Sequence, residues 1–403
     1  MSDVDADDRW DLVVVGAGPA GAATALGALA ARPHLKVLML DRADFPRDKS
    51  CGDGIAPHVF DALAGVGVHD LADGWAPLHR LELEQGSASV SRPLARPVWV
   101  IPRAVFDHRL VQRAIAAGAV LRRHRVRTLR VDADAVVLDE RIRARVVVGA
   151  DGVHSVVRAA IAGRASASRQ ALAIRGYAPT APEWQGRQVI VYGHRRQPSY
   201  AWAFDRGDGL TNVGYGELLG DHHGGPSRTL LLDQLDQLLP GAASTGEHWR
   251  AHHLPLSGWR LDQPTGRVLL VGDAAGLVNP MTGEGIYYAV ATGILAGSAA
   301  ARALDEGAPE RAGALHGKSV QRLLGRHVKN TFVAARLSRV PAVVDAGIHA
   351  AARDQRAFDD LVEIGLGRGV ITPRLAGELA TGLVRGHRSR RRDDQRIRTS
   401  TPK

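Results

Sequence analysis

The stretch Asp11-Leu-Val-Val-Val15-Gly16-Ala-Gly18-Pro-Ala-Gly21 decides how the first part of this chain folds. Its apolar, β-branched beginning predicts a short buried strand over residues 11–15. The alanine-rich residues 22–31 predict a helix, and residues 36–40 predict a second strand. Strand, glycine turn, helix and strand together form a βαβ unit.

The glycines of this turn are spaced as a dinucleotide-binding turn requires. Gly16 permits the tight turn, Gly18 lets a pyrophosphate approach the backbone, and Gly21 lets the helix pack closely on the strand. Pro19 and Ala20 open the helix, where unpaired N–H groups and the helix dipole favour phosphate. The turn therefore predicts a dinucleotide cofactor, although it does not distinguish NAD from FAD.

Asp41 and a second glycine-rich segment extend this prediction. Asp41 ends the second strand and can accept a hydrogen bond from a ribose hydroxyl. Residues 267–271 predict another buried strand, which places Gly272 and Asp273 at the edge of the sheet that binds ligands. Asp273 can accept a hydrogen bond from a polyol such as ribityl. The following helix can stabilise negative charge on a reduced flavin, and its approach contains Pro280, Gly283, Gly285 and Ile286. This second segment favours FAD.

Composition limits the remaining function classes. The chain has 403 residues, of which 45% are hydrophobic and 23% charged, so it can bury a large core. Its acidic beginning does not resemble a secretory signal. Cys51 is the only cysteine, which excludes intrachain disulfides and cysteine zinc clusters and favours the reducing cytoplasm. Histidine pairs at 222–223 and 252–253 lack suitably spaced partners, so no metal site is predicted.

The positive charge is concentrated at the end of the chain. The formal net charge is +10, and residues 385–403 supply +6 of it through eight arginine or lysine residues against two aspartates. A disordered solvated tail is one interpretation, and attraction to anionic lipid headgroups is another. No nucleic-acid partner is expected, because no aromatic residues interleave with these arginines.

Together these motifs resemble the FAD-dependent geranylgeranyl reductase family, within the p-hydroxybenzoate hydroxylase-like flavoproteins. The resemblance covers roughly residues 8–300 and rests on the segments 16–21, 49–54, 151–152 and 272–286. Tyr200-Ala-Trp202-Ala-Phe204 is similar to the Tyr-x-Trp-x-Phe-Pro motif of that family, with Asp205 in place of the proline.

The resemblance and the strand pattern predict an α/β fold. A Rossmann-like FAD-binding domain with a parallel sheet is interleaved with a mostly antiparallel substrate-domain sheet, and helices complete the chain. We expect the FAD-binding domain to comprise 8–75, 101–170 and 262–310, and the substrate domain 76–100 and 171–261. A helical region over 311–384 and a basic, disordered tail over 385–403 follow.

The resemblance also implies roles for individual residues. Beyond the glycine turns, the residues implied to bind FAD are Arg42, Cys51, Gly52, Arg103, Val126 and Asp151. Cys51 is the candidate catalytic residue as a proton donor, but it can equally fill a tight turn as a small apolar residue. Similarly, Tyr200, Trp202 and Phe204 either form the wall of an apolar substrate cavity or belong to the core of the second sheet.

The leading hypothesis is a flavin-dependent reductase of carbon–carbon double bonds in an isoprenoid or similar apolar substrate. An isolated alkene must be protonated as it accepts hydride, so the site needs an acid and a dry pocket. NADPH, another electron donor or a donor protein would supply the electrons. A cytoplasmic location is expected, and the basic tail would allow contact with a membrane surface.

Three alternatives use the same scaffold. A monooxygenase would hydroxylate or epoxidise its substrate. A halogenase needs an active-site lysine, and the chain has none between Lys49 and Lys318. A non-catalytic FAD or lipid carrier would hold a flavin that no reductant can bleach.

Overall fold

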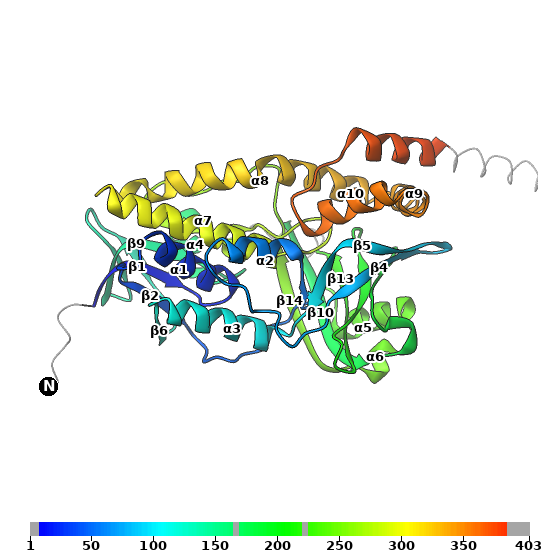
Figure 1. Ribbon diagram of the computed structural model, residues 1–403, viewed down its shortest axis with the longest axis horizontal. Helices are drawn as coiled ribbons and strands as arrows, with labels where there is room; N and C mark the ends of the chain where they lie inside the picture. The colour runs from blue at the N-terminus through cyan, green and yellow to red at the C-terminus, as the bar shows by residue number, and fades with distance from the viewer. Residues whose placement is uncertain (1–7, 164–168, 220–224, 385–403) are drawn as a thin grey trace, which may run out of the picture.

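The computed structural model describes residues 8–163, 169–219 and 225–384, and these residues form two sheets and a set of C-terminal helices (Figure 1). The histidines at 222–223 and the basic tail at 385–403 lie outside the described residues. The predicted fold class is confirmed: one sheet is built mainly from parallel strands, and a second, mostly antiparallel sheet is interleaved with it in sequence.

The first sheet has the strand order β6-β2-β1-β9-β8-β7, with β15 pairing to β9. The βαβ unit predicted at its centre is present as β1 (Arg9–Val15), α1 (Pro19–Ala31) and β2 (Val37–Asp41). Strand β1 is parallel to both β2 and β9, so its apolar residues are buried from both sides. The other strands are β6 (Val120–Arg123), β7 (Leu129–Val131), β8 (Val136–Leu138), β9 (Ile142–Gly149) and β15 (Val268–Leu270).

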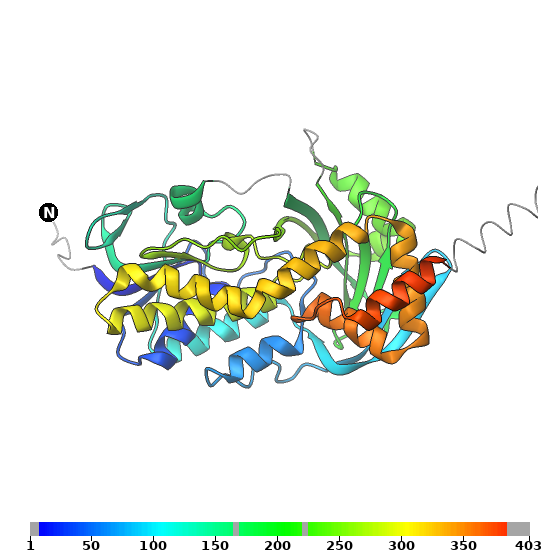
Figure 2. The same ribbon diagram turned by 90° about the horizontal axis from the view of Figure 1, so that it is seen from above.

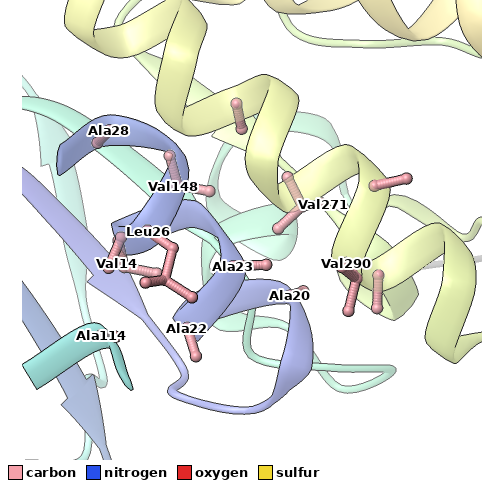
Figure 3. Packing of buried hydrophobic residues seen from close by; sticks show 14 of the residues in the cluster. Val14, Ala20, Ala22, Ala23, Leu26, Ala28, Ala114, Val148, Val271 and Val290 are labelled. Atoms are coloured by element: carbon pink, nitrogen blue, oxygen red, sulfur yellow. The ribbon is translucent and has the colours of Figure 1, made fainter. Parts of the chain in front are cut away.

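Helices α1 and α7 (Ile286–Asp305) pack against each other over this sheet. Figure 3 shows their small side chains, with Ala20 and Ala23 of α1 in the same buried cluster as Val290 of α7. Such close packing requires glycine, because a Cβ on Gly293 would overlap the Ala20 carbonyl oxygen. Helices α2 (Pro57–Ala64), α3 (Arg103–Ala116) and α4 (Val156–Ala162) complete this part of the molecule, with the short turns η3 (Gly272–Ala275) and η4 (Pro309–Arg311).

The second sheet has the order β14-β10-β13-β12-β11-β4-β5-β3. All its pairings are antiparallel except that between β11 and β4, which joins the hairpin from residues 78–100 to the later strands. Its members are β3 (Gly54–Ile55), β4 (Leu78–Gln85), β5 (Ala88–Val100), β10 (Gln170–Pro179), β11 (Gln188–Tyr192), β12 (Tyr200–Asp205), β13 (Leu210–Leu218) and β14 (Glu247–Pro255).

Helices within the second unit were not predicted from the sequence. Residues 170–260 were expected to be strands, but α5 (Arg228–Leu238) and α6 (Ala242–Thr245) lie between β13 and β14, and η2 (Pro182–Trp184) precedes β11. A usable signal existed, because the Ser227 hydroxyl caps α5 by accepting from the Leu230 N–H, and Leu231 and Leu235 are buried at helical spacing.

The C-terminal helices of the predicted fold class are present as α8 (Ala312–Leu337), α9 (Pro341–Arg353), α10 (Gln355–Leu366) and a last helix over residues 373–384. Figure 2 shows α8 running along the molecule from the first sheet to the second, where α9, α10 and the last helix gather. Among the described residues, no helix combines the length and apolar character needed to cross a bilayer.

Candidate active site

A cavity of about 1020 Å³ extends from the glycine turn of α1 past the second sheet to the C-terminal helices. At one end it is lined by backbone and charged side chains of the first sheet. At the other end its walls are apolar and come from β4, β11 and β12 on one side and from α9, α10 and residues 371–379 on the other. One space therefore joins a polar compartment to an apolar one.

The first glycine turn lies at the polar end. Gly16 has a φ of 96°, a backbone conformation that favours glycine, and a Cβ there would lie 2.7 Å from the Ala150 carbonyl carbon. A Cβ on Gly18 would meet only the Arg47 Nη2, at 3.3 Å, so this glycine leaves the backbone open toward the cavity. Pro19 and Ala20 also line the cavity at the start of α1. Gly21 does not, and its role is packing, since a Cβ there would overlap the Gly16 carbonyl oxygen.

Asp41 lies at the end of β2 beside this turn. Its carboxylate accepts hydrogen bonds from the backbone N–H of Ala17 (2.9 Å) and of Ala43 (3.0 Å). The side chain is buried and lines the cavity. Asp41 thus ties the two loops together and still has acceptor capacity for a hydroxyl group.

Three other predicted cofactor residues line the same end. Arg42 is exposed at the rim, and Val126 is buried in the wall. Arg103 opens α3 and is only 4% exposed, because Asp107 accepts hydrogen bonds from its Nε (2.6 Å) and Nη2 (2.8 Å). This buried ion pair fixes the guanidinium at the cavity wall.

The loop that carries Cys51 is anchored to the second sheet. Asn212 donates to the Cys51 carbonyl oxygen (2.9 Å) and to the Asp53 carboxylate (2.8 Å), and it accepts from the indole N–H of Trp202 (2.8 Å). Asp53 is fully buried, and burial raises the pKa of its carboxyl to about 6 against the opposing charge of Arg175. This anchor could not be predicted from the sequence, because its members come from segments that are far apart along the chain.

Cys51 and Gly52 both line the cavity at the tip of this loop. Burial raises the pKa of the Cys51 thiol, and the neighbouring Arg103 charge opposes that rise. The thiol is thus held in its neutral form, as a proton donor or a small apolar group would be. Both interpretations of Cys51 stay open.

Lys49 is a site residue that the sequence reasoning passed over. Its ammonium lies 3.1 Å from the Asp273 carboxylate and lines the cavity. Burial opposes ionisation of Asp273, but the charge and hydrogen bond of Lys49, together with the charges of His252 and Arg103, outweigh it and lower the pKa of the carboxyl. Nearby, burial and then the Lys49 charge lower the pKa of His252 to about 4. The ion pair ties the Cys51 loop to the turn that follows β15.

The second glycine-rich segment closes this side of the cavity. Pro280, Gly283, Gly285 and Ile286 line the cavity in front of α7. Gly272 does not, because it faces Ala20 and Ala289 and has a φ of 52°. Between the two lining glycines stands Glu284, which is not among the site residues predicted from the sequence.

Glu284 places an ionisable carboxyl at the centre of the site. Its Oε1 accepts a hydrogen bond from the Tyr287 N–H (2.8 Å) in the first turn of α7, and the residue lines the cavity. Burial raises the pKa of this carboxyl to about 7, although the backbone N–H groups of Tyr287 and Ile286 favour the charged form. A group with such a pKa can give or take a proton near neutral pH.

The aromatic strand β12 forms the boundary between the two compartments. Tyr200, Trp202 and Phe204 all line the cavity, so the cavity-wall interpretation fits their position. The Tyr200 hydroxyl donates to the Thr282 carbonyl oxygen, and Trp202 lies over Gly214 of the neighbouring strand, where any side chain would overlap its ring. The rings of Trp202 and Phe204 also face Gly52, where a Cβ would lie 3.5 Å from the Trp202 Nε1 and 3.4 Å from the Phe204 Cε2.

Asp205 and Asp151 both make hydrogen bonds that order the backbone near the site. Asp205, which stands where the family has proline, is buried and accepts from the backbone N–H of Gly186 (2.7 Å) and Gly207 (2.9 Å), so it orders the turn after β12. Asp151 lines the cavity, but its carboxylate accepts from the Ser155 hydroxyl (2.5 Å) and the Val156 N–H (2.7 Å) at the start of α4.

The polar compartment fits an FAD molecule. The glycine turn leaves backbone uncovered at a helix N-terminus, as a pyrophosphate requires. Two lining side chains have buried nitrogen atoms without a partner among the described residues, the His252 Nε2 and the Arg175 Nη1. Unpaired buried polar atoms are costly, so a polar ligand beside them is expected. Within the same residues no cluster of three or more potential metal-ligating side chains is found.

Comparisons with known proteins agree with this geometry. Residues 9–314 match the FAD binding domain family. The chain is 33% identical to the menaquinone reductase of Mycolicibacterium smegmatis, over 72% of this chain and 75% of that protein. It is 32% identical to digeranylgeranylglycerophospholipid reductase 1 of Methanopyrus kandleri, over 74% and 82%.

Among solved structures, a geranylgeranyl bacteriochlorophyll reductase-like protein from Thermoplasma acidophilum superposes with a TM-score of 0.75. The superposition covers 94% of this chain and 99% of that one at 18% sequence identity, which establishes the shared fold.

Proposed function

This chain belongs to the FAD binding domain family and, within it, to the geranylgeranyl reductase group, and from this premise we propose that it is an FAD-dependent reductase of carbon–carbon double bonds in an isoprenoid or similarly apolar substrate. The observation that carries the proposal is the single cavity that joins a dinucleotide compartment to an apolar one. Monooxygenation on the same scaffold is the alternative.

The proposed cofactor site uses the residues at the polar end of the cavity. Backbone at Gly16, Gly18 and Ala20 would hold the FAD pyrophosphate, and Asp41 a ribose hydroxyl. Arg42, Arg103 and Val126 would hold the remainder of the adenosine and diphosphate part. Bound and reduced, FAD supplies a hydride at its N5 atom. NADPH or a donor protein in a cytoplasmic setting is proposed as the electron source.

The protein's own contribution is to position the alkene, exclude water and deliver a proton. The apolar wall of Tyr200, Trp202 and Phe204 would hold the alkene beside the cofactor, in a compartment from which apolar side chains exclude water. A carbon centre that accepts hydride must also receive a proton, and the lining offers two candidate donors, Cys51 and Glu284.

Glu284 is the better of the two acids. The raised pKa of the Cys51 thiol makes it a weak donor, whereas a carboxyl with a pKa of about 7 keeps about half of its population protonated at neutral pH and is acidic enough to give its proton up. We therefore propose that Glu284 donates the proton and that Cys51 shapes the turn beneath the alkene.

Single-turnover reduction tests the function without assuming a physiological reductant. The protein is loaded with FAD, reduced anaerobically with dithionite and mixed with a geranylgeranyl-chain compound. We expect the product to gain two hydrogens by mass spectrometry, and in D₂O the proton that the protein delivers should appear as deuterium.

A product that gains an oxygen atom in air, as an alcohol that keeps its double bonds or as an epoxide, would instead establish the monooxygenase. A bound flavin that neither dithionite nor NADPH can bleach would point to a non-catalytic carrier.

A further inference from the structure

We propose that the junction between α8, α9 and the last described helix is a membrane-docking surface, through which an anionic bilayer delivers the apolar substrate into the cavity. We call this surface the mouth patch and define it as Arg336, Leu337, Arg339, Val340, Leu383 and Val384. The inference rests on the proposed function, because an apolar substrate resides in lipid and must leave it to reach the flavin.

The apolar end of the cavity reaches this junction. Leu337 and Ser338 at the end of α8, Val343 and Gly347 of α9, and Leu379 of the last helix all line the cavity. Leu337 is also 43% exposed, so it belongs both to the cavity lining and to the molecular surface. The cavity therefore lies directly beneath the mouth patch.

The ends of two helices bring the patch together. Arg353, at the end of α9, pairs with Glu378 (3.1 Å), whereas a Cβ on Gly382 would lie 3.0 Å from the Cβ of Ala346. The last helix thus runs antiparallel to α9, and its end at Val384 points toward the start of α9. Figure 2 shows the last helix beside α9.

The side chains of this junction are unusually apolar for a surface. Val340 is 52% exposed, Val384 53% and Leu383 37%. With Leu337 they are four of the nine large hydrophobic side chains that are exposed in the described part of the chain. Clustered exposed aliphatic side chains mark sites of contact with a membrane or a partner.

The charge around the patch selects an anionic bilayer as the partner. Arg336 and Arg339 are exposed, and in the described part of the chain neither makes an ion pair with a carboxylate. Directly after Val384 the sequence continues with residues 385–403, which carry a net charge of +6. Cations that flank exposed aliphatic side chains suit anionic headgroups above an acyl layer.

Vesicle co-sedimentation of the full chain tests this surface. Phosphatidylcholine vesicles with and without phosphatidylglycerol are compared for the wild type and for V340E/V384E, which changes two side chains outside the cavity lining. V131E is the matched control, because Val131 is 51% exposed on β7 in the first sheet. FAD affinity and circular dichroism verify that each variant is folded.

We expect the wild type and V131E to bind the anionic vesicles, and V340E/V384E to bind them at least tenfold more weakly. Turnover of substrate presented in detergent should be equal in all three proteins, while turnover of substrate in vesicles should fall in V340E/V384E alone.

Equal vesicle binding by V340E/V384E and the wild type would overturn the proposal. The proposal would also be overturned if the wild type bound vesicles with and without phosphatidylglycerol equally, or bound neither kind. If no variant turns over substrate in detergent, the proposed function fails, whereas the vesicle-binding result still judges the docking surface.

Discussion

The carboxyl group of Glu284 lies between two glycines that line the cavity, and burial sets its acidity against the opposing effect of the Tyr287 and Ile286 N–H groups. Its pKa of about 7 means that the acid form is lost as the pH rises past neutrality. The residue could not be singled out from the sequence, because a glutamate in a glycine turn gives no indication of its burial.

Replacing Glu284 by glutamine should remove the proton donor while preserving the hydrogen bond from Tyr287. We expect E284Q to lower the rate of alkene reduction by about 100-fold or more, the usual contribution of a general acid. The wild-type rate should fall as the pH rises above about 7, and this fall in rate should be absent in E284Q. Stopped-flow oxidation of the reduced flavin by substrate measures both.

The variant C51S tests the other candidate proton donor, Cys51. If Glu284 is the donor, C51S keeps this fall in rate at its wild-type pH. If the fall in rate at high pH disappeared in C51S and persisted in E284Q, Cys51 rather than Glu284 would be the proton donor.

At the scale of helices, the contact between α1 and α7 holds the two glycine turns at their correct separation. A Cβ on Gly297 would overlap the Thr24 carbonyl oxygen and lie 2.5 Å from the Ala28 backbone nitrogen. These are backbone atoms of a helix, so they cannot move aside as a flexible side chain would.

G297A should therefore push α7 away from α1. We expect a loss of about 2 kcal/mol in the free energy of unfolding, as for overpacked cores, together with weaker FAD binding. Gly377 is the matched control, since nothing lies within 4 Å of a Cβ there and G377A should be neutral or stabilising. Urea denaturation and flavin titration measure the effects, and equal behaviour of the two variants would refute this packing argument.

Helix α8 is attached to the first sheet by His316, which is fully buried and lies 3.1 Å from the Leu270 carbonyl oxygen. Burial lowers the pKa of this imidazole to about 4. The unfolded chain binds the proton more tightly than the folded one, so stability is complete above about pH 6.5 and is lost as the pH falls toward 4.

A variant that cannot titrate should lose this acid sensitivity. Between pH 7 and pH 4, we expect the free energy of unfolding of the wild type to fall by up to about 3 kcal/mol more than that of H316Q, because of the size of the pKa shift. Urea denaturation at both pH values measures the difference. Equal losses of unfolding free energy in the two proteins would show that groups other than His316 cause the acid sensitivity.

For the whole molecule, the cavity links parts of the chain that are far apart in sequence, and its length is set by the C-terminal helices. Gly347 of α9 lines the apolar end, where a Cβ would make only an ordinary contact of 3.7 Å with Leu379. A large side chain at this position should shorten the cavity without touching the cofactor compartment.

G347F should thus discriminate substrates by length. We expect its kcat/KM for a geranylgeranyl compound to fall by about tenfold or more relative to a short isoprenoid, because misplacement of the reacting carbon is costly. H349F, on the exposed side of the same helix, should behave as the wild type. An equal loss for long and short substrates in G347F would show that the far end does not hold the chain.

Local features of the fold followed from the sequence. The βαβ unit and the helix after Gly285 were predictable, because burial periodicity and glycine turns act over a few residues. Helix α5 was missed although its Ser227 cap was available. The domain boundaries and the individual binding roles of the site residues stay predictions.

Sequence by itself determined which turn would approach a dinucleotide and which strand would carry aromatic side chains. Only the tertiary structure decided that Lys49 meets Asp273, that Asn212 anchors the Cys51 loop, and that α9 lines the far end of the cavity. Turns and amphipathic strands are encoded by neighbouring residues, whereas the burial of Glu284 and the pairing of Lys49 arise where distant segments exclude water from the same space.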